Sequence, residues 1–207
     1  MTAMRNRATE KNTRKADAEG SWALARTRKG KNRTGSKGKN MSLIQQAVDE
    51  MNWHKVRSQV QEELVFKPMD HWLWLTLGLA YYEEKEYEKA LTCSKRAVEL
   101  APNCALALWH YAGSLYMTGH EPSALVIWTI ILNMEIEEVA YDEHGEGMDW
   151  ALQLINDVHY RVGRYYQWAG KTDLARESFE KYLHNRRHGV ASIYDKEEVE
   201  KHLAKIG

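Results

Sequence analysis

The amino-acid sequence is poor in cysteine and proline, has no long apolar run, and carries no net charge over its 207 residues. The longest apolar stretch, at 124–132, is far shorter than the roughly 20 residues of a membrane-spanning helix. No apolar secretory core follows the first residues, so we expect neither a membrane span nor export. The two cysteines, Cys93 and Cys104, match no zinc or redox spacing, and we expect inert core thiols in a reducing compartment.

The zero net charge conceals a split along the chain. Residues 1–40 contain twelve Lys or Arg and three Asp or Glu, whereas residues 41–207 contain seventeen and twenty-six. Because blocks of like charge usually stay solvated, we predict a disordered basic arm over 1–40. This arm could bind phosphate or act as a nuclear address, or it could be a solubilising tail or leader residues upstream of a start at Met41. The sequence leaves these alternatives open.

Three segments share one pattern: a helix with a small residue inside it, a tight turn, and a second helix that opens at an alanine. The clearest copy contains Trp74, Leu77, Gly78, Tyr81, Ala90, Ala97 and Pro102. The second copy contains Trp109, Tyr111, Ala112, Gly119, Ala124 and Trp128. The third copy contains Val162, Gly163, Tyr166, Gly170, Ala175 and Phe179. A pattern that recurs at this spacing indicates a chain built from stacked helical hairpins.

These spacings resemble the tetratricopeptide repeat, a helix–turn–helix unit of about 34 residues. The resemblance covers 71–138 and 156–189 well and the flanks loosely. It implies an all-α solenoid of three to four helix–turn–helix repeats on residues 41–207, with a C-terminal capping helix. The implied units are a degenerate repeat at 41–70, repeats at 71–104 and 105–138, an insertion at 139–155, a repeat at 156–189 and a cap at 190–207.

Small and polar side chains predict where the helices cross and begin. Gly78, Ala112 and Gly163 stand at the crossing of the two helices in their copies, because a larger side chain there would hold the backbones apart. Ser42 and Asp70 precede apolar helical patterns, so each is predicted to cap a helix start.

The later part of the chain has its own signals. Gly119 is predicted to adopt a left-handed turn conformation. Acidic residues and two glycines predict an acidic loop over 140–147, and a long helix is predicted to follow over 148–170. A helix over 172–186 closes the third repeat, and a charged final helix over 196–205 is expected to cap the stack.

The binding surface of such a stack is its concave side, and the resemblance places side chains of the first helices there. These side chains are Trp72, Leu75, Leu79, Tyr82, Trp109, His110, Tyr116, Tyr160, Arg161, Arg164 and Trp168. Aromatic residues and arginine most often dominate interface energetics. The two arginines could grip an acidic group of a partner, or they could pair with Glu143, Glu146 or Asp149 of the insertion. In the second case Tyr160 and Trp168 would pack within the fold, and both interpretations stay open.

The resemblance implies a protein-interaction scaffold or adaptor that holds a partner peptide in this groove. The sequence has no Gly-rich phosphate loop and no nucleophile elbow, so we expect no enzyme. His144 and its acidic neighbours fit a solvated loop better than a metal site, and we expect no cofactor. The expected partner is another protein or peptide in the cytoplasm. Nucleic-acid binding by the basic arm, with nuclear placement, and homo-oligomerisation are the alternatives.

Overall fold

A computed structural model describes residues 36–142 and 145–206 of the chain. These residues form ten α-helices and no strand, so the predicted all-α repeat fold is confirmed. The helices are α2 (Ser36–Asp49), α3 (Trp53–Phe66), α4 (His71–Glu83), α5 (Tyr87–Leu100), α6 (Ala105–Met117), α7 (Glu121–Leu132), α8 (Ile136–Tyr141), α9 (Met148–Trp168), α10 (Thr172–Arg187) and α11 (Lys196–Lys205).

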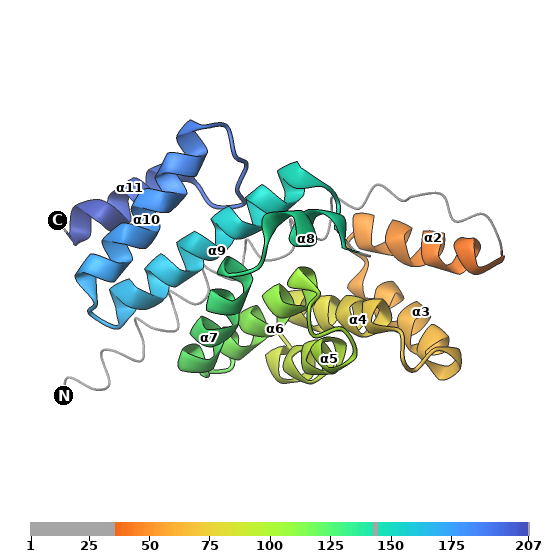
Figure 1. Ribbon diagram of the computed structural model, residues 1–207. Helices are drawn as coiled ribbons and strands as arrows, with labels where there is room; N and C mark the ends of the chain where they lie inside the picture. Colours follow the sequence, from red (N-terminus) through yellow and green to blue (C-terminus); the bar gives the residue numbers. More distant parts are fainter. Residues whose placement is uncertain (1–35, 143–144, 207) are drawn as a thin grey trace, which may run out of the picture.

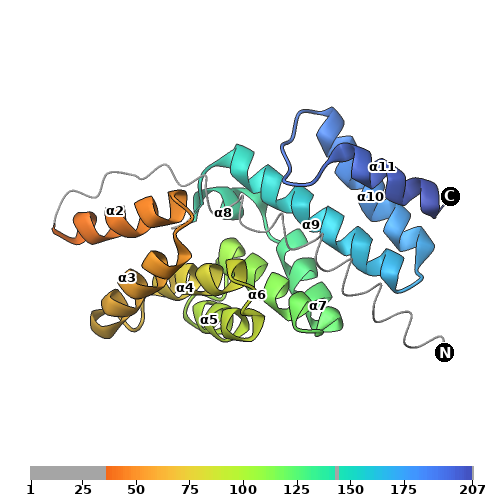
Figure 2. The same ribbon diagram turned by 180° about the vertical axis from the view of Figure 1, so that it is seen from behind.

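Consecutive helices pack in pairs, and the pairs follow one another along the molecule (Figure 1). α4 packs against α5, α6 against α7, and α9 against α10. Contacts of α3 with α4, α5 with α6, and α7 with α9 join neighbouring pairs. The reverse view shows the same order, with α2 and α3 at one end and α10 and α11 at the other (Figure 2). This is the arrangement of a helical solenoid.

Small residues lie where paired helices come closest. A Cβ atom added to Gly78 would lie 3.3 Å from the Cβ of Cys93 on α5, and one added to Gly163 would lie 2.6 Å from the ring of Phe179 on α10. Ala112 is fully buried. The crossings predicted at Gly78 and Gly163 are therefore confirmed, and the lack of space explains why the repeat pattern has Gly there.

Two helix starts test the predicted N-caps. The Asp70 carboxylate accepts hydrogen bonds from the backbone N–H of Trp72 at 3.0 Å and of Leu73 at 3.3 Å, so it caps α4 as predicted. The prediction for Ser42 is wrong, because α2 begins at Ser36. The end of the predicted arm is therefore helical, and residues 1–35 lie outside the described part of the chain.

The insertion departs from the predicted acidic loop at its start. The loop was expected from Ala140, but helix α8 continues to Tyr141. Val139 and Ala140 are fully buried in the core. A helix this short gains its stability from tertiary packing, and the local sequence pattern does not report such packing.

The remaining helix boundaries lie close to the predicted ones. α9 occupies the position of the helix expected at 148–170, α10 that of the helix at 172–186, and α11 that of the helix at 196–205. Gly119 and Gly170 follow helices with φ of +86° and +69°, so the left-handed turn predicted for Gly119 is confirmed.

Buried side chains form two main groups. One surrounds α2–α5 and includes Val56 and Leu73, and the larger one spans α6–α11 and includes Trp128. Cys93 and Cys104 are buried, as predicted, and burial raises the pKa of the Cys93 thiol to about 11. None of the helices in the described part of the chain is long and apolar enough to cross a membrane.

Candidate protein-binding site

The structure buries ten of the eleven predicted groove residues. They are Trp72, Leu75, Leu79, Tyr82, Trp109, His110, Tyr116, Tyr160, Arg161 and Arg164. The eleventh, Trp168 at the end of α9, is 52% exposed and packs beside Tyr165, with ring centres 5.8 Å apart. The expectation that all these side chains line an open surface needs correction, because ten of them face other parts of the chain in this conformation.

The amino-acid sequences of α4 and α6 explain why their predicted groove residues are buried. Both helices have apolar residues on every side, a pattern typical of helices surrounded by other helices. Trp72 and Leu79 of α4 pack in the group around α2–α5, whereas Trp109 and Tyr116 of α6 join Tyr160 in the larger group. The predicted groove therefore divides into a set on α4 and a second set on α6 and α9, while Leu75 of α4 packs in a third, smaller group with Ala97 and Ala107.

The second set gathers around one guanidinium. The Arg161 guanidinium carbon lies 5.9 Å from the ring centre of Trp109 and 6.0 Å from that of Tyr116, so it links α9 to α6. It also lies 5.2 Å from the ring centre of Tyr194, a residue between α10 and α11. A cation that contacts aromatic faces away from water binds them more strongly than an exposed one does.

Arg164, one turn further along α9, contacts α11. Its Nη1 donates a hydrogen bond to the Tyr160 hydroxyl at 2.9 Å and lies 3.6 Å from a carboxylate oxygen of Glu198. Burial and the adjacent guanidinium lower the pKa of His202, so its Nε2, 3.0 Å from Nη1, can accept a hydrogen bond in the neutral ring. The Glu198 carboxylate beside Arg164 therefore comes from α11, within the same chain.

We call residues 190–206 the C-terminal segment, and a buried carboxylate anchors its first part. Asp157 of α9 accepts hydrogen bonds from the Ser192 hydroxyl at 2.5 Å and from the Ile193 backbone N–H at 3.3 Å. Burial raises the pKa of Asp157 to about 7, while these two donors and the charges of Arg161 and Arg186 oppose the rise. The donors of the segment thus help to keep a buried carboxylate charged.

Tyr194 fixes the middle of the C-terminal segment on α9. Its ring stacks on the ring of Tyr160, with ring centres 3.8 Å apart and planes within 18° of parallel. The Tyr182 hydroxyl of α10 donates a hydrogen bond to the Tyr194 carbonyl oxygen at 2.5 Å. The C-terminal segment therefore contacts Tyr160, Arg161 and Arg164, three of the four α9 residues of the predicted groove.

Sequence reasoning missed five residues of this site, namely Asp157, Ser192, Tyr194, Glu198 and His202. Only Asp157 gives a local signal. It is a carboxylate one turn before Arg161, on the face of α9 that also carries the buried Leu154 and Val158. A charged residue on an apolar helix face needs a buried partner or a donor.

Other predicted features bear less on the site. Among the described residues, no group of three or more His, Cys, Asp or Glu side chains lies close enough to hold a metal ion. His144 and Glu143 of the insertion lie outside the described residues, as does the basic arm over 1–35.

Two segments of the chain match family models. Residues 71–104, which form α4 and α5, and residues 157–186, within α9 and α10, both match the tetratricopeptide repeat. The chain therefore contains tetratricopeptide repeats. Such repeats serve in general as protein-interaction scaffolds, and this chain has that architecture.

Curated relatives share parts of this chain. It is 44% identical over 85 residues to the tetratricopeptide repeat protein 30 homolog of Drosophila melanogaster, which is 41% of this chain and 12% of the relative. It is 27% identical over 106 residues to protein bimA of Emericella nidulans, which is 51% of this chain and 11% of the relative. The chain therefore spans about a tenth of the length of these relatives.

A solved structure has a similar fold. The crystal structure of MamA protein matches with a TM-score of 0.56 and 17% sequence identity, over 81% of this chain and 87% of that chain. At this identity the likeness concerns the fold alone.

Proposed function

We propose that this protein holds a segment of another protein against an aromatic–arginine surface on α6 and α9. This surface consists of Trp109, Tyr116, Tyr160, Arg161 and Arg164. The observation that supports the proposal is that a peptide segment already contacts Tyr160, Arg161 and Arg164 of this surface, namely the C-terminal segment of the chain itself. In the proposed function a partner segment replaces it.

The contacts of the C-terminal segment indicate what a partner segment would contain. The aromatic ring of Tyr194 stacks on the Tyr160 ring and lies 5.2 Å from the Arg161 guanidinium carbon. Four residues later, the Glu198 carboxylate accepts a hydrogen bond from the Tyr160 hydroxyl at 3.2 Å and lies beside Arg164. Charge-assisted hydrogen bonds and cation–π contacts of this kind favour a segment with an aromatic residue followed one helical turn later by an acidic one.

A partner segment would compete with a tethered one. A segment joined to its site by a short loop acts at an effective concentration in the millimolar range. The partner must therefore bind more tightly than the C-terminal segment, or the C-terminal segment must first be weakened. This competition gives the proposal a test in which two substitutions act in opposite directions.

The probe for the test is a fluorescein-labelled synthetic peptide with the sequence of residues 190–206, measured by fluorescence anisotropy on the full-length chain. The Tyr194→Ala variant loosens the tethered segment, so it is expected to bind the peptide at least about tenfold more tightly than the wild type does. The double variant Tyr194→Ala/Arg164→Ala should not show this gain in affinity for the peptide. The exposed Lys181→Ala on α10 is the control and should bind as the wild type does.

The result that would overturn the proposal is a Tyr194→Ala variant that melts near the wild-type temperature and still fails to bind the peptide. Affinity purification with the same variants then identifies the partner. A protein that uses this surface is captured in larger amount by Tyr194→Ala and is lost with Arg164→Ala. A merely structural effect would lower capture by both.

A further inference from the structure

A second surface of the molecule has the composition of a docking site, and it lies on α7, away from the aromatic–arginine surface. α7 contains a single charged residue, Glu121, and this side chain is buried. Val126 and Ile130 on the outer side of the helix are 58% and 45% exposed. A solvated helix face normally carries charged side chains, and an exposed apolar face commonly marks an interaction site.

The preceding repeat offers a matched comparison. α5 is the second helix of its repeat, as α7 is of the next, and the two repeats are 34 residues apart in the resemblance described above. At that spacing Thr92 and Arg96 of α5 correspond to Val126 and Ile130 of α7. Arg96 forms an ion pair with Glu99 at 3.1 Å. The outer face is thus polar in one repeat and apolar in the next, so the apolar face is a local feature of α7 and not a requirement of the fold.

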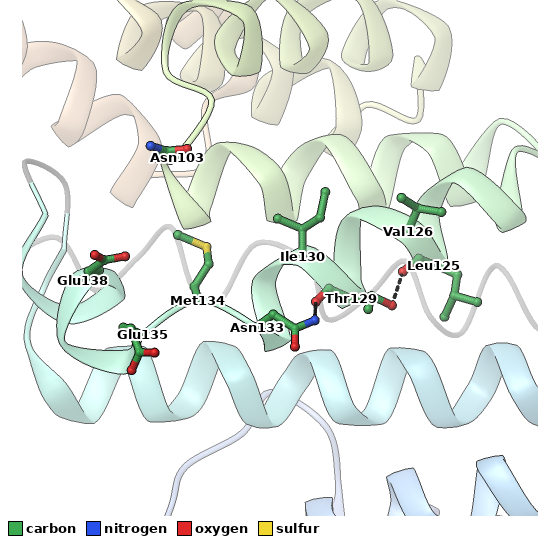
Figure 3. A pocket seen from close by; sticks show the side chains of 9 residues that line it. All are labelled: Asn103, Leu125, Val126, Thr129, Ile130, Asn133, Met134, Glu135 and Glu138. Atoms are coloured by element: carbon green, nitrogen blue, oxygen red, sulfur yellow. Dashed lines mark hydrogen bonds between the residues drawn. The ribbon is translucent and has the colours of Figure 1, made fainter.

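The exposed face of α7 forms the floor of a groove of about 620 Å³ (Figure 3). The floor consists of Leu125, Val126, Ile130 and Met134. It extends about 12 Å along α7 between Leu125 and Asn133 at 1.5 Å per residue, which equals two to three turns of a helix. The groove is therefore long enough for a short helical segment.

Two polar side chains in the groove already form hydrogen bonds with the backbone of α7. Thr129 donates a hydrogen bond to the Leu125 carbonyl at 2.9 Å, and the Asn133 amide donates one to the Thr129 carbonyl at 2.7 Å (Figure 3). An extended peptide needs partners for its backbone N–H and C=O groups, whereas a helix satisfies its own. The floor therefore suits a helix better than a strand.

One end of the groove is acidic. Glu135 and Glu138 line it near α8, both are exposed, and neither forms an ion pair with a Lys or Arg in the described part of the chain. We infer that the groove on α7 binds an amphipathic helix of another protein. This helix lies with an aliphatic ridge on Leu125, Val126 and Ile130 and with basic residues against the two glutamates. Charge complementarity at the rim sets its direction, and the apolar ridge supplies most of the affinity.

The test uses a fluorescein-labelled stapled helix of about four turns with leucines on one face and lysines in its last turn. A second peptide has glutamates in place of the lysines. The full-length chain is expected to prefer the lysine peptide about tenfold, and Ile130→Ser should weaken that binding by about the same factor. Arg96→Ser at the corresponding position of α5 is the matched control and should leave binding unchanged. Thermal melting checks that both variants remain folded.

Reversing the charge at the acidic end of the groove gives the most decisive comparison. The Glu135→Lys/Glu138→Lys variant should prefer the glutamate peptide, which a general loss of stability does not produce. Equal affinity for both peptides in the wild type, or no change on reversal, overturns the inference. Light scattering on the chain alone tests whether a second copy of the chain binds the groove instead. A dimer that Ile130→Ser abolishes would assign the groove to a second copy and would also overturn the inference. None of these outcomes depends on the aromatic–arginine surface.

Discussion

Three glycines inside helices provide a graded test of how closely the helices pack. Gly113, Gly78 and Gly163 all occupy helix interiors, where Gly→Ala gains about 1 kcal/mol of helix propensity in the absence of any clash. The space beside each glycine differs. An added Cβ would lie 3.8 Å from Tyr82 at Gly113, 3.3 Å from Cys93 at Gly78, and 2.6 Å from the Phe179 ring at Gly163.

These distances predict three different outcomes. At Gly113 the contact is an ordinary one, so Gly113→Ala should raise the free energy of unfolding by about 0.5–1 kcal/mol. At Gly78 a slight overlap should roughly cancel the propensity gain of about 1 kcal/mol. At Gly163 the ring must move, and overpacking costs about 1–3 kcal/mol. After the propensity gain is subtracted, Gly163→Ala should therefore lower the free energy of unfolding by up to about 2 kcal/mol, or up to roughly 8 °C in melting temperature.

The ring of Phe179 has little freedom to move aside. It is fully buried, and it stacks on the His202 ring with centres 5.6 Å apart and lies 6.4 Å from the Tyr160 ring. Gly163→Ala is therefore expected to loosen α11 as well as the crossing of α9 and α10. Leucine at position 179 lacks the outer ring atoms, so Phe179→Leu in the Gly163→Ala background should cost less than it does alone.

The assay is urea unfolding followed by circular dichroism at 222 nm, a wavelength that reports helix content, with thermal melting as a second measure. The expected order of stability is Gly113→Ala above wild type, Gly78→Ala near it, and Gly163→Ala below it. Equal stability of Gly113→Ala and Gly163→Ala would refute the reasoning, because propensity alone treats the two sites alike. Additive effects of Gly163→Ala and Phe179→Leu would show that the clash is not with the ring.

Two further predictions concern a cap and a buried histidine. Asp70→Ala should lower the free energy of unfolding by about 1 kcal/mol, whereas Asp195→Ala, whose side chain makes no cap hydrogen bond at α11, should lower it less; urea unfolding of both checks this. Burial lowers the pKa of His110 to about 4 from 6.5, so the unfolded state binds more protons between these pH values and the free energy of unfolding rises with pH there. Between pH 4 and 7 the free energy of unfolding should rise less steeply with pH in His110→Gln than in the wild type. An equally steep rise would contradict the lowered pKa of His110.

Much of the fold is predictable because its signals are local. Asp70 and Gly119 act on backbone groups a few residues away, so their roles can be read from neighbouring residues. The small residues at 78, 112 and 163 belong to a repeat pattern, and each copy of this pattern can be read within one short segment of the sequence. The short helix α8 was missed, because Val139 and Ala140 are buried by contacts that a local window does not contain. The start of α2 at Ser36 was missed as well.

The site was less predictable for the same physical reason. The family resemblance groups Arg161 and Arg164 with aromatic residues of α6 and α9, and the structure places Arg161 near the rings of Trp109 and Tyr116 and Arg164 near the ring of Tyr160. The resemblance cannot reveal that Tyr194 and Glu198 lie against these residues, because they come from a segment up to 38 residues further along the chain. The apolar groove on α7 was also missed, although Val126 and Ile130 stand in a helix with a single charged residue.

The division of the buried side chains between α2–α5 and α6–α11 has a mechanical meaning. In a linear stack each layer is held only by its immediate neighbours, so the loss of an outer layer leaves the inner ones in place. Such a molecule is expected to unfold in steps when it is pulled from its ends, with the helix pairs separating one after another. Strain applied to one end is absorbed there before it reaches the other.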